Sequence, residues 1–400
     1  MSDVVLLERI HDAAEVALGR AGLTMARVDG GLSGQPLIDA IATTRFLGIR
    51  SKSHVNADVI AASPSLEAIG CFCIGTNQVD LEAAAAAGVV VFNSPFSNTR
   101  SVAELTIAET IALQRKLFDR SMGLHGGHWS KSASGAHEVR GRTIGIVGYG
   151  HIGSQVSVLA EAMGMRVLYH DVLPRMALGN AQPCDSLAEL LRESDVVTLH
   201  VPATATTKNL IDAKAIARMK QGASVINNAR GSVVDLAALR VAIESGHISG
   251  AAIDVFPEEP GSNDEPFECP LAGCPNVILT PHVGGSTEEA QAQIATDVAT
   301  KLSRYAATGT TSSAVNVPEV DLPDHQADQA RILHFHRNVP GVLSALHTII
   351  ADSGANIHAE YLQSHGDLSY VILDIDRVEA AAVGSRIAAL PETIRYRILG

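Results

Sequence analysis

The sequence predicts an α/β protein built on parallel sheets, followed by a smaller C-terminal unit that mixes strands and helices. Apolar segments typical of buried strands alternate with helical patterns from residue 1 to about residue 300, which is the pattern of parallel α/β architecture. One of these strand-like segments ends in a glycine-rich turn. The tail instead predicts the order β-α-β-β-α-β, which is the ferredoxin-like arrangement.

The glycine-rich turn is Gly148-Tyr-Gly-His-Ile-Gly153, and it directly follows the apolar residues 143–147. In this spacing Gly148 makes a tight turn, Gly150 lets the backbone approach a pyrophosphate, and Gly153 lets the next helix pack closely on the strand. The helix presents unpaired N–H groups and its positive dipole end to the phosphates. An ordinary glycine-rich turn is the alternative, because this motif alone is a weak signal.

The strand that follows strengthens the dinucleotide interpretation. Residues 166–170 form a second apolar segment that ends at Asp171, about 20 residues after the glycine turn. A carboxylate at that place accepts the ribose hydroxyls of NAD and repels the 2′-phosphate of NADP. Strand, helix, strand and acid in this order therefore predict a Rossmann-type domain that binds NAD.

Length and composition exclude several other classes of protein. The 400 residues suffice for two or three domains, and 46% hydrophobic with 18% charged residues is typical of a globular protein. The formal charge of −13 argues against nucleic acid or an anionic membrane as a partner, so an anionic substrate needs a locally basic site. No apolar run approaches about 18 residues and no secretory signal is visible, so we expect a cytoplasmic protein without a transmembrane helix.

The cysteines give no sign of a metal site. Two of them alternate as in a strand, which is typical of small buried hydrophobic residues, and all five are Cys71, Cys73, Cys184, Cys269 and Cys274. We expect reduced thiols and no bound metal.

The dinucleotide motif begins only at residue 143, although in a simple Rossmann protein it lies near the N-terminus. Another domain therefore precedes it or is wrapped around it. Residues 1–97 form an α/β series of their own, with strands expected at 44–49, 66–74 and 89–92.

The tail is predicted to be a separate unit. A helical pattern at residues 287–305 leads into residues 308–328, which are rich in Thr, Ser, Pro and Asp and which we interpret as a hinge or linker. Beyond it, the expected elements are strands at 331–336, 355–363, 370–375 and 393–399, with helices from Pro340 and over 378–390.

Three polar residues stand on loops after apolar strand-like segments downstream of the motif: Arg230, Glu259 and His282. In an open α/β sheet such strand ends face the ligand crevice. Arginine binds a carboxylate in a planar fork, histidine can move a hydroxyl proton, and a glutamate beside the histidine stabilises the imidazolium. The set predicts hydride transfer at a carbon that bears oxygen, whereas any one residue alone could be a loop-end ion pair or cap.

These segments resemble the D-2-hydroxyacid dehydrogenase superfamily, and the whole chain resembles its phosphoglycerate-oxidising branch with one C-terminal ACT domain. The segments that carry the resemblance are Ile69-Gly-Cys-Phe-Cys-Ile-Gly-Thr-Asn-Gln-Val-Asp80, Asn93-Ser-Pro-Phe-Ser-Asn-Thr-Arg-Ser-Val-Ala-Glu104, Gly148-Tyr-Gly-His-Ile-Gly153, Asn228-Ala-Arg-Gly231, Asp254-Val-Phe-Pro-Glu-Glu-Pro260 and Thr280-Pro-His-Val-Gly-Gly-Ser286.

The resemblance implies a discontinuous substrate domain into which the nucleotide domain is inserted. Residues 1–97 and 286–326 would form the flavodoxin-like substrate domain, residues 98–285 the NAD-binding Rossmann domain, and residues 327–400 a ferredoxin-like ACT domain that regulates the enzyme. The hydroxyacid would bind in the cleft between the first two domains. The family also implies a homotetramer, built as a dimer of dimers.

The resemblance also implies roles for single residues. Arg230 would orient the substrate, His282 would be the acid/base, and Glu259 would be its partner, because the family glutamate immediately precedes the proline. The residues that would bind NAD are Gly148, Gly150, His151, Ile152, Gly153, Asp171, Asn228, Ala229, Arg230, Asp254, His282, Val283, Gly284 and Gly285.

The substrate carried over from the branch is 3-phospho-D-glycerate, oxidised to 3-phosphohydroxypyruvate in the first step of phosphorylated L-serine biosynthesis. The residues that would bind it are Arg50, Ser51, Lys52, Ile74, Gly75 and Lys131, the last reaching a neighbouring subunit that Trp129 anchors. Lys52 stands where relatives carry arginine, which keeps the charge but loses the bidentate fork. From the residues alone, a surface loop with solvated cations and a packed tryptophan is the alternative.

Two other functions remain open at this point. One is another D-2-hydroxyacid dehydrogenase, such as a hydroxypyruvate, erythronate-4-phosphate or 2-hydroxyglutarate-forming enzyme. The other is a non-catalytic NAD-sensing interaction protein on the same fold. In the tail, His336, Asn338 and Asn356 resemble the serine-binding residues of the ACT domain, so feedback inhibition by serine is implied. The alternative is a purely structural dimerisation domain with helix-cap residues.

Overall fold

The computed structural model describes residues 2–260, 264–324, 326–377 and 380–400. The chain forms two compact units. We call residues 98–290 the central unit, and residues 1–97 with residues 291–400 the outer unit. In the parts of the chain that the structure describes, no helix has the length and apolar character needed to cross a membrane.

The central unit is built on a seven-stranded sheet in which every neighbouring pair is parallel, as the alternation of strands and helices predicts. The strand order is β12-β11-β10-β9-β6-β7-β8, so the direction of winding reverses between β6 and β9, where Rossmann proteins bind their ligand. The strands are β6 (Thr143–Val147), β7 (Arg166–His170), β8 (Gln182–Pro183), β9 (Val196–Leu199), β10 (Ala223–Asn227), β11 (Ile248–Ile253) and β12 (Val277–Leu279).

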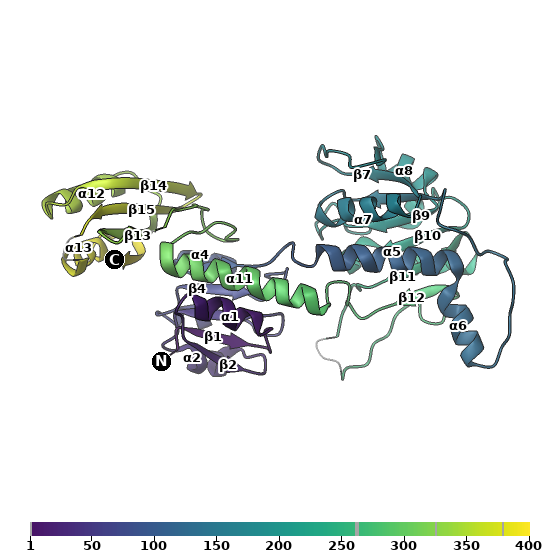
Figure 1. Ribbon diagram of the computed structural model, residues 1–400, viewed down its shortest axis with the longest axis horizontal. Helices are drawn as coiled ribbons and strands as arrows, with labels where there is room; N and C mark the ends of the chain where they lie inside the picture. Colours follow the sequence, from purple (N-terminus) through teal and green to yellow (C-terminus); the bar gives the residue numbers. More distant parts are fainter. Residues whose placement is uncertain (1, 261–263, 325, 378–379) are drawn as a thin grey trace. The chain divides into compact units, whose positions relative to one another are not determined.

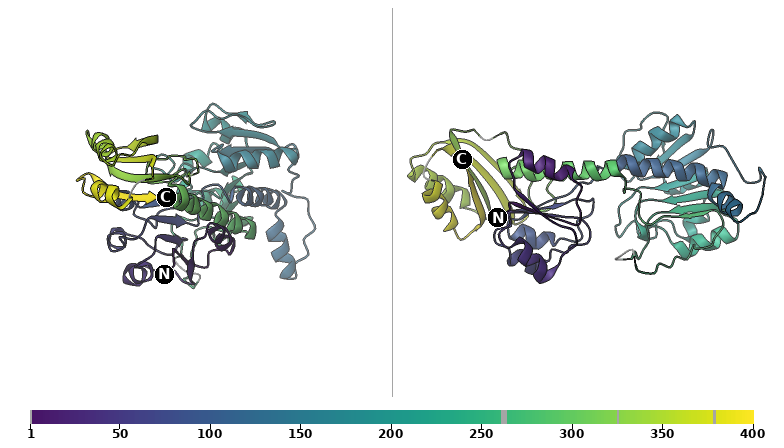
Figure 2. Two further views of the ribbon diagram at one scale, coloured as in Figure 1. Left: turned by 60° about the vertical axis from the view of Figure 1, so that its left-hand side comes forward. Right: turned by 60° about the horizontal axis from the view of Figure 1, so that its bottom comes forward.

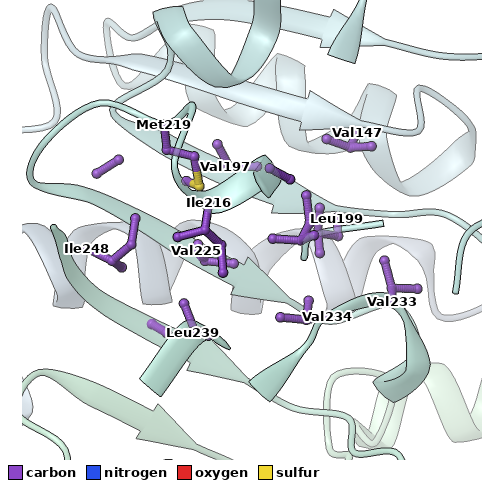
Figure 3. Packing of buried hydrophobic residues seen from close by; sticks show 14 of the residues in the cluster. Val147, Val197, Leu199, Ile216, Met219, Val225, Val233, Val234, Leu239 and Ile248 are labelled. Atoms are coloured by element: carbon purple, nitrogen blue, oxygen red, sulfur yellow. The ribbon is translucent and has the colours of Figure 1, made fainter. Parts of the chain in front are cut away.

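Helices cover both faces of this sheet, and a separate hydrophobic core fills each side. On one face, α5 (Thr99–Arg115) and α7 (His151–Ala162) lie side by side (Figure 1) and pack on the alternate strand residues of that face. On the other face, side chains of β9 and β10 point toward α9 and α10 (Figure 3). The remaining helices of the unit are α6 (Leu117–His125), α8 (Leu187–Glu193), α9 (Ala213–Ile216), the 3-10 turn η1 (Gly231–Val233) and α10 (Leu236–Glu244).

The outer unit begins with a five-stranded parallel sheet in the order β2-β1-β3-β4-β5, which is the flavodoxin-like order expected. The long helix α11 (Glu288–Thr308) lies against this sheet (Figures 1 and 2), and its Val298 and Leu302 occupy the space that a side chain at Gly70 would need. The other elements are β1 (Val4–Leu7), α1 (Ala13–Arg20), β2 (Met25–Val28), α2 (Gly34–Ile41), β3 (Phe46–Ile49), α3 (Ala57–Ala61), β4 (Ala68–Cys71), α4 (Leu81–Ala86) and β5 (Val90–Phe92).

The tail forms a four-stranded antiparallel sheet in the order β14-β15-β13-β16, which confirms the ferredoxin-like arrangement. The helix predicted from Pro340 begins at Val342, because Gly341 caps it in the left-handed region with φ 98°. Val378, where the second helix was predicted to begin, lies outside the described residues. The elements are β13 (Gln329–Arg337), α12 (Val342–Asp352), β14 (Ile357–His365), β15 (Leu368–Asp376), α13 (Ala380–Ala388) and β16 (Thr393–Leu399).

The interpretation of residues 308–328 as a linker is wrong, because much of this segment is buried. Thr311 is fully buried, and its hydroxyl donates to the Pro318 carbonyl at 2.8 Å and accepts from the Val320 N–H at 2.9 Å. Leu322 is 5% exposed. Hydroxyl groups that hydrogen bond to the local backbone let a polar segment pack, and composition alone does not reveal this.

The tail also shares a hydrophobic core with the first sheet. Phe335 and Tyr370 of the tail belong to the same buried cluster as Phe46 and Tyr305. The guanidinium of Arg397 in β16 lies 4.7 Å from the centre of the Tyr305 ring. The tail therefore keeps the predicted strand order but does not pack as a separate body, and the three-domain partition stays a prediction.

Candidate functional site

The glycine-rich turn between β6 and α7 has the geometry that a phosphate-binding backbone needs. Gly148 has φ 92°, and a Cβ atom there would lie 2.6 Å from the His200 carbonyl oxygen. A Cβ atom at Gly153 would lie 2.2 Å from the carbonyl oxygen of Gly148, whereas one at Gly150 would meet nothing within 4 Å. The turn is thus packed on its inner side and open at Gly150, the N-cap of α7, which fits a pyrophosphate at the helix N-terminus.

Asp171 stands at the end of β7, next to this turn. Its Oδ2 accepts a hydrogen bond from the Tyr149 N–H at 2.8 Å, which ties the carboxylate to the glycine-rich turn. The Nε of Arg175 lies 3.4 Å from the same oxygen. A carboxylate in this position suits a ribose with two free hydroxyls. His151 and Ile152 lie in the first turn of α7.

Arg230 lies just beyond β10 and is the exposed residue of an otherwise buried turn that the side chain of Asn227 holds. The side chain of Asn227 donates to the Arg230 carbonyl at 3.0 Å and accepts from the Ala229 N–H at 3.2 Å. The guanidinium of Arg230 donates to the Ala229 carbonyl at 2.7 Å, and the rest of its fork is exposed to solvent. Gly231 follows, and a Cβ atom there would lie 1.9 Å from the backbone of Phe256.

His282 and Glu259 come from two different loops and form a hydrogen-bonded pair. The Nδ1 of His282 lies 2.8 Å from the Oε2 of Glu259, and the Oε1 of the same carboxylate accepts from the Phe256 N–H at 3.0 Å. His282 has φ 53°, in the left-handed region that non-glycine residues rarely adopt. The neighbouring Glu258 is exposed.

Asp254, at the end of β11, holds the loop that carries His282. Its Oδ1 accepts from the Thr280 hydroxyl at 2.6 Å and from the Val283 N–H at 2.8 Å, and its Oδ2 accepts from the Gly284 N–H at 2.8 Å. The carboxylate is 1% exposed. The same loop has no room for a side chain at Gly285, because a Cβ atom there would lie 2.1 Å from the Asn98 side chain.

A cavity of about 680 Å³ opens beside the histidine–glutamate pair. Its walls include Glu259 and His282, and the ring of Phe256 packs edge-on against that of Phe267 at 4.6 Å between ring centres. The histidine–glutamate pair therefore faces a partly apolar space large enough for a small ligand. Within the described ranges, no group of three or more His, Cys, Asp or Glu side chains could hold a metal ion, and the five cysteines are free thiols.

A buried acid, Glu109 of α5, was missed by the sequence analysis. It is 3% exposed, and its Oε2 accepts from the Asn228 side chain at 2.7 Å. Burial raises the pKa of Glu109 to about 8, the negative charge of Asp254 raises it as well, and the hydrogen bond from Asn228 opposes both. The only sequence signal was an acidic residue on the apolar face of an otherwise ordinary helix.

The predicted phosphate-binding residues lie in the outer unit, on the loop after β3. Arg50 is half-buried and Ser51 and Lys52 are exposed. A second missed residue, Glu8, holds this loop: its Oε1 accepts from the Arg50 N–H at 3.1 Å and its Oε2 from the Lys52 N–H at 2.9 Å. The loop thus presents two cations over a carboxylate that is bound to the backbone beneath them.

The other predicted substrate residues occupy two further segments. The Ile74 carbonyl accepts from the Asn93 side chain at 2.6 Å, and the Gly75 carbonyl accepts from the Cys73 thiol at 3.1 Å, so this turn of the outer unit is fixed. Lys131 belongs to the central unit and is exposed, as is Trp129, with 80% of its surface accessible. An accessible indole of this size fits the expected insertion into a second subunit.

The three predicted effector residues do not meet within one chain. His336 lies near the end of β13, opposite Ser369, and Asn338 donates to the Gly366 carbonyl at 3.0 Å. Asn356 precedes β14, and its carbonyl accepts from the Asp376 N–H at 3.0 Å. Ser369 and Asp376 mark opposite ends of β15, about 20 Å apart at the usual rise of a strand. A site that contains all three residues would need two copies of the tail.

Comparisons with known proteins cover nearly the whole chain. The D-isomer specific 2-hydroxyacid dehydrogenase NAD binding domain matches residues 107–284, and an AHAS small subunit-like ACT domain matches residues 332–395. The D-3-phosphoglycerate dehydrogenase of Escherichia coli is 50% identical over 398 residues, which cover 99% of this chain and 97% of that protein. The D-3-phosphoglycerate dehydrogenase of Haemophilus influenzae is 49% identical over 396 residues, which cover 99% of this chain and 96% of that protein.

Solved structures share the architecture of the first two sheets. The D-lactate dehydrogenase from Aquifex aeolicus, crystallised with NAD and lactic acid, is similar with a TM-score of 0.65 and 27% identity, covering 76% of this chain and 95% of that chain.

Proposed function

This chain belongs to the D-3-phosphoglycerate dehydrogenases within the D-isomer specific 2-hydroxyacid dehydrogenase family, and we propose that it oxidises 3-phospho-D-glycerate to 3-phosphohydroxypyruvate with NAD. The observation that carries the proposal is the 2.8 Å pair of His282 and Glu259, which follows strands of the same parallel sheet as the glycine-rich turn, in a chain half identical to these enzymes over its full length. The product is the precursor of serine in the phosphorylated route.

The turn and Asp171 fit the cofactor that the family uses. The backbone at Gly150 is open to a pyrophosphate, and the carboxylate of Asp171 is held in place by the Tyr149 N–H. When bound, NAD supplies the nicotinamide carbon that accepts a hydride. The remaining residues proposed to bind it are those of the strand-end loops, from Asn228 to Arg230 and from His282 to Gly285.

The protein's own residues then divide the rest of the chemistry. Arg230 binds the substrate carboxylate through the part of its fork that stays free. Because Nδ1 of His282 faces Glu259, Nε2 is the nitrogen left to take the C2 hydroxyl proton while the hydride leaves C2. Glu259 stabilises the imidazolium that this step creates. The hydride carries both electrons of the oxidation away from C2. The electron pair of the broken O–H bond forms the new carbonyl bond.

Arg50 and Lys52 are the residues proposed to bind the phosphate, with Lys131 contributed to a neighbouring subunit. The test is turnover of a panel of hydroxyacids with NAD and with NADP. We expect 3-phospho-D-glycerate with NAD to have the highest kcat/KM, and Arg50→Ala with Lys52→Ala to raise its KM far more than that of an unphosphorylated hydroxyacid. Equal turnover of unphosphorylated acids would point to another hydroxyacid dehydrogenase. NADH binding without any turnover would point to a sensing protein.

The ACT domain indicates a second small-molecule ligand, and L-serine is the proposed effector. His336 and Asn356 contact residues at opposite ends of β15. The proposed serine site therefore forms between two chains that pair through their tails. These pairs would be part of a dimer of dimers. Coupling between two such sites usually changes affinity about 5- to 150-fold.

Serine binding can be measured by calorimetry on the intact protein, with the oligomeric state followed in parallel. Asn356→Ala should weaken serine binding and leave turnover without serine unchanged. His365→Ala, at the exposed far end of β14, the strand that follows Asn356, is the matched control. If calorimetry detected no serine binding to the intact protein, the tail would be an assembly module and not a serine-binding domain.

A further inference from the structure

Glu109 and Asn228 form a buried pair directly beneath the turn that carries Arg230. They are 119 residues apart in the sequence, and both are almost fully buried, with 3% and 7% of their surfaces exposed. The amide nitrogen of Asn228 uses both of its hydrogens, donating to the Glu109 Oε2 at 2.7 Å and to the Thr106 hydroxyl at 3.0 Å. The Thr106 hydroxyl in turn donates to the Val102 carbonyl at 2.9 Å.

Each partner keeps one buried oxygen that nothing satisfies. Among the described residues, neither the Oε1 of Glu109 nor the Oδ1 of Asn228 has a hydrogen-bond partner. If Glu109 were ionised, both atoms would be acceptors without a donor, and such atoms are costly in a protein interior. One proton on the carboxyl oxygen removes both deficits at once, because an acid O–H and an amide carbonyl are complementary.

We propose that Glu109 is a neutral carboxylic acid whose O–H is donated to the Asn228 carbonyl oxygen, so that the two side chains form a cyclic acid–amide pair that positions Arg230. In this pair the amide N–H donates to one carboxyl oxygen and the second carboxyl oxygen donates back. The role rests on the proposed function, in which Arg230 binds the substrate carboxylate. Glu109 is a positioning residue, because it acts through the turn and touches no reacting atom.

The surroundings of Glu109 favour the neutral form. The strands that pack on α5, β10 to β12, contain no ionisable residue, and the buried residues of α7 are Gly153, Val156, Ser157 and Ala160. On α6, Asp119 and Arg120 are half-buried and His125 is exposed, and the carboxylate of Asp119 accepts from the Asn276 N–H at 2.7 Å. On α5 itself, Arg100, Glu104 and Arg115 are exposed. The charged group that acts on Glu109 is Asp254, which is negative, and both burial and this charge raise the pKa of Glu109.

The pair is placed to control the substrate arginine. Asn228 is held through its side chain by α5, and the turn continues through Ala229 to Arg230, whose carbonyl is tied to Asn227. Loss of the Glu109 proton would set two acceptor oxygens against each other and place a second negative charge near Asp254. The turn would then lose the hydrogen bond that fixes it, and the KM for the hydroxyacid would rise while kcat changed little.

The proton itself can be observed without substrate or cofactor. Infrared spectroscopy of the unliganded protein should show a protonated carboxyl band at neutral pH that disappears as the pH rises through about 8 and that Glu109→Gln removes. This measurement does not depend on the proposed function. If the wild-type protein showed no such band at neutral pH, the proposal would be overturned even if 3-phospho-D-glycerate were turned over well.

The positioning role is tested separately, by steady-state kinetics between pH 6.5 and 9.5. Glu109→Gln preserves the size and hydrogen bonds of the neutral acid, so it should keep the neutral-pH KM and lose the alkaline rise in KM. Asn228→Ala should raise the KM for the hydroxyacid about 2- to 10-fold, the worth of one hydrogen bond. The same alkaline rise in wild type and Glu109→Gln, or a raised neutral-pH KM in Glu109→Gln, would contradict the role.

Discussion

The Nδ1 atom of His282 lies 2.8 Å from the Oε2 atom of Glu259, although the two residues come from different loops. Glu259 is itself held by the Phe256 N–H, and the His282 loop is held by Asp254. Hydrogen bonds to the backbone therefore hold both the Glu259 carboxylate and the loop that carries His282. This arrangement sets the ring orientation of His282 and leaves its Nε2 as the atom proposed to take the substrate proton.

Replacing Glu259 should weaken catalysis without changing the fold. A hydrogen bond to a charged group is worth about 1.5–3 kcal/mol, so Glu259→Gln is expected to lower kcat about 10- to 100-fold, toward the lower end because the pair is partly exposed. Glu258→Gln, at the exposed neighbouring position, is the matched control and should keep wild-type kcat. Equal losses in the two variants would remove Glu259 from the acid/base pair.

Removing the histidine should affect turnover far more than cofactor binding. General acid–base catalysis contributes about 100- to 10,000-fold, so His282→Ala should lose that much in kcat. Fluorescence titration should show a much smaller change in the NADH Kd than in kcat. Near-normal turnover of the variant would refute the assignment.

Asp171 should determine the choice of NAD over NADP. Asp171→Ala is expected to raise the KM for NAD about 10- to 100-fold, since it removes the charged acceptor of the ribose hydroxyls. It also frees Arg175, which lies 3.4 Å from the carboxylate, to contact a 2′-phosphate. Any gain in NADP use should therefore vanish in the double variant Asp171→Ala/Arg175→Ala. A wild-type protein that used both cofactors equally would contradict the prediction.

Glu109 should make the protein's stability depend on pH. Its pKa is raised from an ordinary 4.5 to about 8, so between these values the folded state holds a proton that the unfolded state has lost. The free energy of unfolding therefore falls as the pH rises through this window. Each tenfold difference in proton affinity is worth about 1.4 kcal/mol. Glu109→Gln should gain stability relative to wild type between pH 5 and 9, by thermal or chemical denaturation. A difference that stayed constant with pH would show that Glu109 is not protonated in the folded protein.

Glu67 should be a stability residue of the outer unit. Its carboxylate accepts from the Nε of Arg45 at 2.8 Å and from the guanidinium of Arg397, and it is 17% exposed. Glu67→Ala would leave the guanidinium of Arg397, which is 15% exposed, without its carboxylate, and Arg45, which is 36% exposed, with only Asp3 at 3.6 Å, so it should cost about 2–4 kcal/mol in urea denaturation. The exposed pair of Arg100 and Glu104 gives a matched control, and Glu104→Ala should cost less than about 1 kcal/mol. Equal costs would mean that the Glu67 pair is screened like a surface pair.

Local patterns predicted most of the fold and suggested the residues that we propose for the active site. Residues 143–147, the three glycines and Asp171 could be read from the sequence because each is specified by its near neighbours. Arg230, Glu259 and His282 could be predicted because parallel strands bring their ends to one edge of the sheet.

What the sequence could not predict depends on contacts between distant segments. Glu109 became a candidate only when Asn228, 119 residues away, was seen to contact it in the interior. The role of Glu8 depends in the same way on the backbone of residues 50–53. The linker assignment failed because Thr311 satisfies its hydroxyl locally and is buried, although composition places it among flexible residues.

The discontinuous outer unit has a consequence for the order in which the protein is made. Arg397 in β16 contacts Glu67, which directly precedes β4, so the contacts that complete the outer unit can form only after β16 has been synthesised. Residues 98–290, by contrast, are contiguous and can complete their own sheet during translation. The nucleotide-binding half is thus available early, while β1 to β5 lack these contacts until β16 has been made. Truncated chains from interrupted translation should accordingly contain a folded central unit and an incomplete outer one.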